Sequence, residues 1–487
     1  MKKEYIILFA IFILTFAFRA FFALQTDNFS ADSAYYNLRH TDYISQNLQP
    51  MIYDDLSYGG RYIIDAHIFH YMLAAARVAL PDFFVFKLLP EMLFAAMIFI
   101  VYAIAKRLTQ NTTAPLLAAL ISGFIPIFIQ NSVNSISVYS IVFPLIFYQV
   151  YCLMNIETHK GRFVALSIML PIIHPFTAVL VISFIFYAIL LNVESIKIRK
   201  QAREAIIFFA LLVLLMSFII YKKAFLSLGL YAVLQNIPPA LLNTYFVNIN
   251  VFSLISGIGI IPLILGAMGI VFGLSWEKSD SAYLLSALVL SDFVLLFLKL
   301  ISFAVGMMFL GILLSILSAV AIEKAVAYVK ITKFARFKKP IFAGFIVLVA
   351  LLLVLPSYLS ARTTIRQAVS ADEINALEWI KANSPGDSTV LGYIEDGDLI
   401  AAVAKRKTVA DTTFMFAPDR YDDVHTMLTT ESLVKATQLM HRYGVDYIFI
   451  SQKVRDAYKM EDLKNANTEC FEAGYSGEKA KVYKLLC

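Results

Sequence analysis

The sequence predicts a polytopic α-helical membrane protein of about 11 spans, followed by a C-terminal α/β soluble domain. Three observations lead to this fold class. Of the 487 residues, 60% are hydrophobic; the mean hydropathy is +0.72; and the long apolar runs stop near residue 360. Because soluble domains average about 45–50% apolar residues, the excess indicates a membrane domain over residues 1–360. A polar domain over residues 361–487 follows it.

Apolar runs of spanning length recur along the membrane domain. They lie at about 4–24, 85–105, 114–131, 138–155, 163–174, 176–192, 204–222, 251–274, 281–298, 301–322 and 341–359. The fifth and sixth runs are short. We expect them to form a hairpin that is broken near His174-Pro175, because proline ends a helix.

Charged residues decide which segments span the membrane and which side each loop faces. Residues 61–80 carry several ionisable side chains, so they are predicted to form a helix lying in the outer interface. With 11 spans, the basic groups Lys2-Lys3, Lys106-Arg107 and Lys324 to Lys339 fall on one side. That side is expected to be cytoplasmic, which places the first loop, residues 25–84, and the polar domain outside. No basic run with interleaved aromatics is present, so no nucleic-acid partner is expected.

The polar domain alternates helix and strand patterns, which is typical of an α/β domain. Helices are predicted at 372–383, from 394 to 405 and at 431–443, strands at 388–393, 407–411 and 445–451, and a hairpin at 470–475 with 481–486. Cys470 and Cys487 could pair in an oxidising compartment. Cys152 lies in an apolar run and is expected to be inert.

The first loop places carboxylates where a lipid-borne phosphate would lie. Asp27 and Asp32 stand just beyond the first span. In one interpretation, one of them activates an acceptor nucleophile, or both hold a divalent cation such as Mg²⁺ or Mn²⁺. In the other, which composition alone favours, Ser30 to Ser33 simply begins a helix. Asp54 and Asp55 form a pair of a kind common in turns.

The same loop is rich in tyrosine and histidine. Tyr35 and Tyr36 are among six tyrosines whose position is explained largely by anchoring at the membrane interface. Asp65, His67 and His70 could bind a metal, since residues three apart share a helix face. No fourth ligand is apparent in the sequence.

Three residues near the later spans are further candidates. Lys299 ends the ninth span on the outer side, where it either extends to the interface or binds a lipid phosphate. Asp292 lies seven residues earlier; an acid inside a span is a functional candidate, or it pairs with a neighbouring helix. His174 either contacts a sugar or phosphate, or occupies a satisfied helix break.

The chain as a whole resembles the GT-C superfamily of membrane glycosyltransferases. The likeness lies in the order of its parts: one span, a long acidic outer loop, interfacial helices, a multi-span core and an outer domain. Residues 32–39, Asp-Ser-Ala-Tyr-Tyr-Asn-Leu-Arg, are similar to its first-loop motif, and residues 53–61 resemble the rest of that loop. Residues 299–303 resemble the basic site near the carrier phosphate. The resemblance implies transfer of a sugar from a polyprenyl- or dolichyl-phosphate carrier to a lipid, glycan or protein acceptor. It also implies Asp32, with Asp27 second, as base or metal contact, and Lys299 as phosphate anchor. The further substrate contacts considered are Tyr35, Tyr36, Asp54, Asp55, Arg61 and His174.

Within this superfamily the tail is most similar to the oligosaccharyltransferase catalytic subunit. Residues 379–387 and 390–400 lie where that family carries its Trp-Trp-Asp-Tyr-Gly signature, but both tryptophans of the signature are missing. Residues 131–137 lack the second-loop acids. These departures favour transfer of a monosaccharide, with inversion expected from the family. A divergent oligosaccharyltransferase for protein N-glycosylation is one alternative, and a non-enzymatic glycan-lipid transporter is the other. The location expected is a prokaryotic plasma membrane, archaea included, with the endoplasmic reticulum as an alternative.

Overall fold

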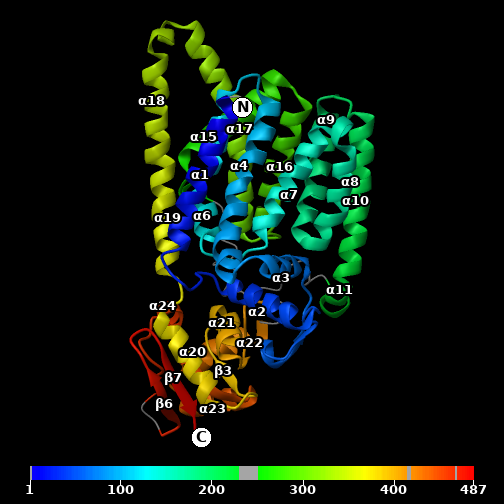
Figure 1. The fold of residues 1–487 in the computed structure, drawn as a ribbon. Coiled ribbons are helices and arrows are strands. Elements are labelled where there is room, and N and C mark those ends of the chain that lie inside the picture. The colour runs from blue at the N-terminus through cyan, green and yellow to red at the C-terminus, as the bar shows by residue number, and fades with distance from the viewer. Residues whose placement is uncertain (1–2, 230–249, 414–417, 465, 467–468) are drawn as a thin grey trace.

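The computed structural model describes residues 3–229, 250–413, 418–464, 466 and 469–487; Lys2, one of the residues used to orient the chain, lies outside them. Figure 1 shows a bundle of long helices with a smaller mixed domain beneath it. The N-terminus lies at the end of the bundle away from this domain, and the C-terminus lies within the domain. The first loop fills the layer between the two.

The bundle consists of apolar helices. In chain order they are α1 (Lys3–Ala23), α4 (Leu89–Leu108), α5 (Thr113–Ser122), α6 (Pro126–Ser132), α7 (Tyr139–Met154), α8 (Ile156–Ile173), α9 (Ala178–Val193), α10 (Lys200–Ile220), α11 (Lys222–Leu228), α14 (Val251–Ile258), α15 (Ile260–Phe272), α16 (Asp280–Phe297), α17 (Phe303–Ile331), α18 (Lys338–Val349) and α19 (Leu355–Arg366). Among the described residues, eight helical stretches are long and apolar enough to cross a membrane. The number is nine if α5 and α6, which meet at 46°, form one bent span.

The predicted number of about 11 spans differs from this count at α7 and α8. α7 has 16 residues, and α8 begins with charged residues, Glu157, Lys160 and Arg162, which lower its hydropathy. Both are nevertheless helices at the predicted positions and stand beside α9 and α10 (Figure 1). The predicted hairpin of α8 and α9 is present, because His174 leaves the helical region with φ −160° and ψ 139°.

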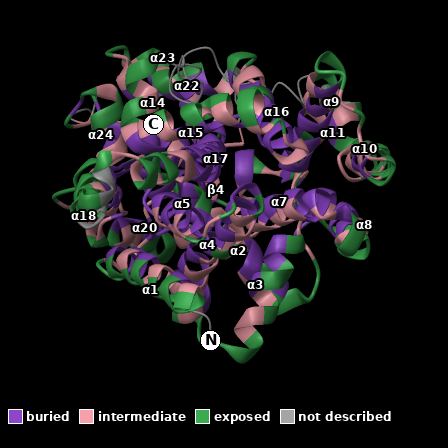
Figure 2. Ribbon diagram, turned by 90° about the horizontal axis from the view of Figure 1, so that it is seen from above, coloured by how far each residue is buried: buried purple, intermediate pink, exposed green. Residues whose placement is uncertain are grey.

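α17 forms the centre of the bundle. In its most apolar window 94% of the residues are buried, and Figure 2 shows it among buried helices near the middle of the molecule. α15 approaches so closely that a Cβ at Gly269 would lie 2.0 Å from the carbonyl oxygen of Leu317; small residues allow two helix backbones to meet in this way. α18 follows α17 in the chain, and α18 and α19 run from the far end of the bundle down to the C-terminal domain (Figure 1). α17 therefore ends at the far end and begins at the end that faces the first loop.

The first loop has structure of its own. It contains α2 (Asp32–Asn47), a small hairpin of β1 (Tyr53–Asp54) and β2 (Arg61–Tyr62), and α3 (Ile68–Ala79). The helix predicted over 61–80 therefore begins only at Ile68. Gly59 and Gly60 have φ of +73° and +126°, a conformation that glycine adopts readily, so the chain reverses there and residues 61–62 pair with β1.

The C-terminal domain is the predicted α/β domain. Its sheet has the order β4-β3-β5-β7-β6, in which β3 pairs in parallel with β4 and β5, while β7 pairs antiparallel with β5 and β6. The strands are β3 (Thr389–Leu391), β4 (Lys407–Thr408), β5 (Val445–Ile450), β6 (Phe471–Ser476) and β7 (Lys481–Leu485). The helices are α20 (Ala371–Asn383), α21 (Gly397–Leu399) with the turn Ile400–Ala404, α22 (Pro418–Thr429), α23 (Leu433–Arg442) and α24 (Gln452–Tyr458).

The sequence missed α22 and α24. α24 has only seven residues, which is too short to display a helical period. A disulfide joins Cys470 to Cys487, and Cys152 is buried and free.

Candidate active site

Asp32 lies at the junction of the first loop and the C-terminal domain. It is the first residue of α2 and is only 7% exposed. Its carboxylate accepts the backbone N–H groups of Asp398, at 3.3 Å, and Leu399, at 2.9 Å. These amides belong to α21, at whose start the N–H groups lack helical partners. Asp32 therefore joins the first loop to a segment more than 360 residues away in the chain.

Further carboxylates surround Asp32. Asp398 is 3% exposed and accepts a hydrogen bond from Thr412 at 3.2 Å. Burial, and then the charge of Asp398, raise the pKa of Asp32 well above its ordinary value, while the Lys453 ammonium opposes this. Burial and the charge of Asp411 likewise raise the pKa of Asp398. Two buried carboxyl groups in contact cannot both ionise easily. The pair therefore retains a proton at pH values at which exposed carboxyl groups have lost theirs.

The raised pKa values predict a pH-dependent junction. Carboxyl groups in an unfolded chain titrate near pH 4. Between about pH 4 and the raised pKa values, the state in which the C-terminal domain is docked on the first loop therefore binds more protons than the undocked state. Docking is therefore most stable at low pH and weakens as the pH rises through the raised pKa values of Asp32 and Asp398. We expect amide hydrogen exchange in α21, corrected for intrinsic rate, to accelerate as the pH rises from about 4 to the raised pKa of Asp398, about 7. Asp398→Asn should flatten this trend; protection that increases with pH would contradict the assignment.

The β1–β2 hairpin holds the same junction from the other side. Ser57 donates to the Asp411 carboxylate, and the Tyr58 hydroxyl donates to the Asp411 carbonyl at 2.8 Å. Arg61 donates to Thr413 Oγ1 at 2.7 Å. Of the predicted contacts, Arg61 thus lies close to the carboxylate cluster.

The other predicted first-loop residues lie in different surroundings. Asp54 is buried in an ion pair with Arg39; burial alone would raise its pKa, but Arg39 holds it below its usual range. The Tyr35 hydroxyl is buried and accepts the N–H of Phe29 at 3.2 Å. Tyr36 donates to Asp65 at 2.7 Å. Asp27 and Asp55 are exposed.

Lys299 lies in the loop between α16 and α17, at the end of the bundle that faces the first loop. It is half-buried, its φ is +57°, and no described residue forms a hydrogen bond or ion pair with its ammonium. Within the part of the chain that the structure describes, Lys299 and Asp32 form no hydrogen bond or ion pair with each other.

Two candidates lie within or beside the bundle helices. His174 Nδ1 accepts the N–H of Phe176 at 3.1 Å and so caps the turn after the helix break. Asp292 is fully buried in α16, and neither of its carboxylate oxygens has a partner among the described residues.

Sequence reasoning missed Asp398, Asp411 and Lys453. Asp398 lies in the segment 390–400 that resembles the oligosaccharyltransferase signature, so that position was a usable signal. Nothing in the sequence distinguishes Lys453, whose ammonium lies 3.5 Å from Asp396.

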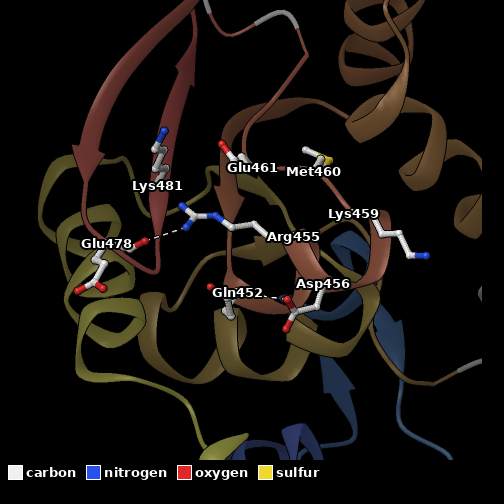
Figure 3. A pocket seen from close by; sticks show the side chains of 8 residues that line it. All are labelled: Gln452, Arg455, Asp456, Lys459, Met460, Glu461, Glu478 and Lys481. Carbon is white, nitrogen blue, oxygen red and sulfur yellow. Dashed lines mark hydrogen bonds between the residues drawn. The ribbon is translucent and has the colours of Figure 1, made fainter.

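A hollow of about 490 Å³ lies elsewhere on the C-terminal domain (Figure 3). Two of its polar side chains already have partners: Arg455 donates to the Glu478 carbonyl at 2.7 Å, and Gln452 donates to Asp456 at 3.0 Å. None of the residues predicted for the site lines it.

No protein-family model and no curated protein matches the chain, but solved structures do. The oligosaccharyltransferase of Archaeoglobus fulgidus in its apo form has a TM-score of 0.69 at 14% identity, covering 97% of this chain and 73% of that one. The archaeal enzyme AglB in complex with an inhibitory peptide and a dolichol-phosphate has a TM-score of 0.70 at 13% identity, over 92% and 70%. ArnT from Cupriavidus metallidurans has 0.57 at 10% identity, over 97% of both chains.

A further structure of the Archaeoglobus fulgidus oligosaccharyltransferase is a complex with Zn and sulfate. A further structure of ArnT is bound to undecaprenyl phosphate. At these identities the likeness shows the fold, so the predicted polytopic GT-C fold is confirmed.

Proposed function

We propose that this membrane protein with the GT-C fold is a glycosyltransferase that takes a sugar from a polyprenyl- or dolichyl-phosphate carrier. The observation that carries the proposal is the buried carboxyl pair of Asp32 and Asp398. It lies at the end of the bundle where the Lys299 ammonium is unpartnered among the described residues. Solved proteins of this fold bind dolichol-phosphate and undecaprenyl phosphate, and a lipid phosphate fits a cation at the membrane surface.

In the proposed reaction an acceptor hydroxyl attacks the sugar C1. Its proton passes to the Asp32–Asp398 pair, whose raised pKa makes the ionised member a stronger base than an exposed carboxylate. The bond between C1 and the phosphate oxygen breaks, and the phosphate leaves on its lipid. Lys299 stabilises the charge that develops on that phosphate. A single displacement of this kind inverts the anomeric centre.

The reaction needs no step through a metal at Asp27 and Asp32. A shared Mg²⁺ or Mn²⁺ requires oxygen ligands that converge on one ion. Asp32 directs its carboxylate to two backbone N–H groups, whereas Asp27 is exposed. These two residues therefore do not fit such a site.

We place the reaction on the extracytoplasmic face. Lys106 and Arg107 end α4 at the opposite end of the bundle, and the run from Lys324 to Lys330 ends α17 there. The positive-inside rule makes that end cytoplasmic. The plasma membrane of a prokaryote fits this arrangement.

Lys299→Asn is expected to weaken donor binding. Asparagine tolerates the left-handed φ of this position, so the change removes the charge without straining the backbone. A charge-assisted hydrogen bond contributes about 1.5–3 kcal/mol, so KM for the lipid-linked donor should rise roughly 10- to 100-fold, as measured by initial rates over a donor series.

Lys278→Asn is the matched control. Lys278 also has a left-handed φ, of +44°, but it precedes α16 at the opposite end and pairs with Glu194. Its KM should stay within about two-fold of wild type. Equal effects of the two changes on KM would show that Lys299 does not bind the donor phosphate.

A transfer assay in membranes tests the function as a whole. Radiolabelled polyprenyl-phosphate monosaccharides are supplied with native lipid extract in one arm and with an Asn-x-Ser/Thr peptide in the other. Label in a lipid or glycan product supports the proposal. Label in the peptide supports the oligosaccharyltransferase alternative, in keeping with the TM-scores of the archaeal structures. Donor binding without transfer would favour a transporter, in which the buried Asp292 is the first residue to test.

A further inference from the structure

Three histidines of the first loop converge below the bundle. His40 lies in α2, His67 precedes α3, and His70 lies in its first turn. One ligand atom from each lies within 4.8 Å of the other two. The ring centroids of His40 and His70 are 5.1 Å apart, and each is 6.1 Å from that of His67.

Several nitrogens of these rings have no partner. His40 is fully buried, and neither of its ring nitrogens has a hydrogen-bond partner among the described residues. The same holds for Nδ1 of His67 and for Nδ1 of His70, which is 3% exposed. Buried polar atoms are nearly always paired, and each one left unpaired costs free energy. These imidazole nitrogens therefore lack a binding partner.

The hydrogen bonds of Asn37 fix the tautomer of His70. The Asn37 amide nitrogen donates to the carbonyls of Ser33, at 2.9 Å, and Ile136, at 2.8 Å. Its Oδ1 must then accept, so the contact of 2.8 Å with His70 Nε2 makes that nitrogen the donor. Nδ1 of His70 is left with a lone pair and has no hydrogen-bond partner among the described residues. A metal-ligating histidine usually donates its other ring N–H to an oxygen acceptor, which fixes its tautomer and orientation.

We propose that His40, His67 and His70 bind one divalent transition-metal ion of the zinc class. Three imidazoles suit Zn²⁺ and leave a fourth tetrahedral position for water or another oxygen ligand. Zn–N bonds of about 2.0–2.1 Å bring tetrahedral ligand atoms to roughly 3.4 Å from one another. Rotation of the side chains, above all of the less buried His67, closes the remaining distance. The sequence had suggested Asp65 as the third ligand, but Asp65 accepts the Tyr36 hydroxyl and His40 takes its place.

The ion would join α2 to α3, and this inference does not depend on the proposed glycosyl transfer. It is tested by metal content, with full-length protein purified in detergent, stripped with chelator and dialysed against Zn²⁺. We expect about one Zn²⁺ per chain in wild type and in His425→Ala, a change of an exposed histidine in the C-terminal domain. His67→Ala and His40→Ala should lose it. Co²⁺ in place of Zn²⁺ should give the absorption bands of a tetrahedral site only where Zn²⁺ binds.

The wild-type measurement stands even if a variant does not fold. Wild-type protein that holds no Zn²⁺ after dialysis, or Co²⁺ spectra that show only octahedral aquo coordination, would overturn the site. So would equal Zn²⁺ binding by wild type and a folded His67→Ala. His67 is the less buried ligand, so this variant is the one best placed to retain the fold.

Discussion

Asp32→Asn is expected to lower the rate of glycosyl transfer by about 10²- to 10⁴-fold, the usual loss when a general base is removed. The substitution keeps the shape of the side chain and an oxygen that can still accept the N–H of Leu399. It removes the ability to take a proton from the acceptor. The measurement is kcat with saturating lipid-linked donor, and KM for the donor should change little because the phosphate is bound elsewhere.

The control for this prediction is Asp27→Asn. Asp27 lies five residues earlier in the same loop but is exposed, so its rate should stay within about three-fold of wild type. Amide exchange in α21 separates catalysis from docking, since Asp32→Asn should leave these amides protected at neutral pH. If the Asp32→Asn protein is fully active and its α21 amides are protected, Asp32 is not the base.

The sequence identified one half of the candidate site and not the other. Asp32 follows a spanning helix and begins a Tyr-rich segment, so a local pattern points to it. Asp398 contacts Asp32, and Asp411 contacts Ser57, only because the C-terminal domain docks on the first loop. No local period or spacing encodes that docking, which explains why a pair of acids separated by 366 residues was not predicted.

The helices were predicted best where the apolar run in the sequence is long. α1 lies at its predicted position, and α17 begins near its predicted start but ends at Ile331 rather than near residue 322. Both are present because apolar runs of spanning length have few alternatives in a membrane. The start of α3 was misplaced, because two left-handed glycines decide it rather than hydropathy. His40 was likewise missed as a ligand: it shares no periodicity with His67 and His70 and meets them only where α2 packs on α3.

A buried ion pair inside the bundle carries the second large prediction. Arg19 of α1 and Glu91 of α4 are each 1% exposed, and their side chains lie 2.8 Å apart. Arg19 also donates to Ser132 at 2.8 Å, and Glu91 accepts the N–H of Asn134 at 2.7 Å. The pair therefore connects α1 and α4 to the end of α6 and to the loop that follows it.

Glu91→Gln should destabilise the protein by about 3–5 kcal/mol, because it leaves the Arg19 charge buried without its counter-ion. The Gln oxygen can still accept the Asn134 N–H, so the change isolates the charge. The double variant Arg19→Met with Glu91→Gln should recover most of this loss, since a buried pair replaced by uncharged side chains is often neutral in stability. The measurement is the free energy of unfolding in mixed SDS and detergent micelles. Glu431→Gln, which breaks an exposed pair with Lys464, should cost less than about 1 kcal/mol. A double variant as unstable as the single one would mean that Arg19 stabilises the bundle through its packing on Phe94 and Phe128 rather than through its charge.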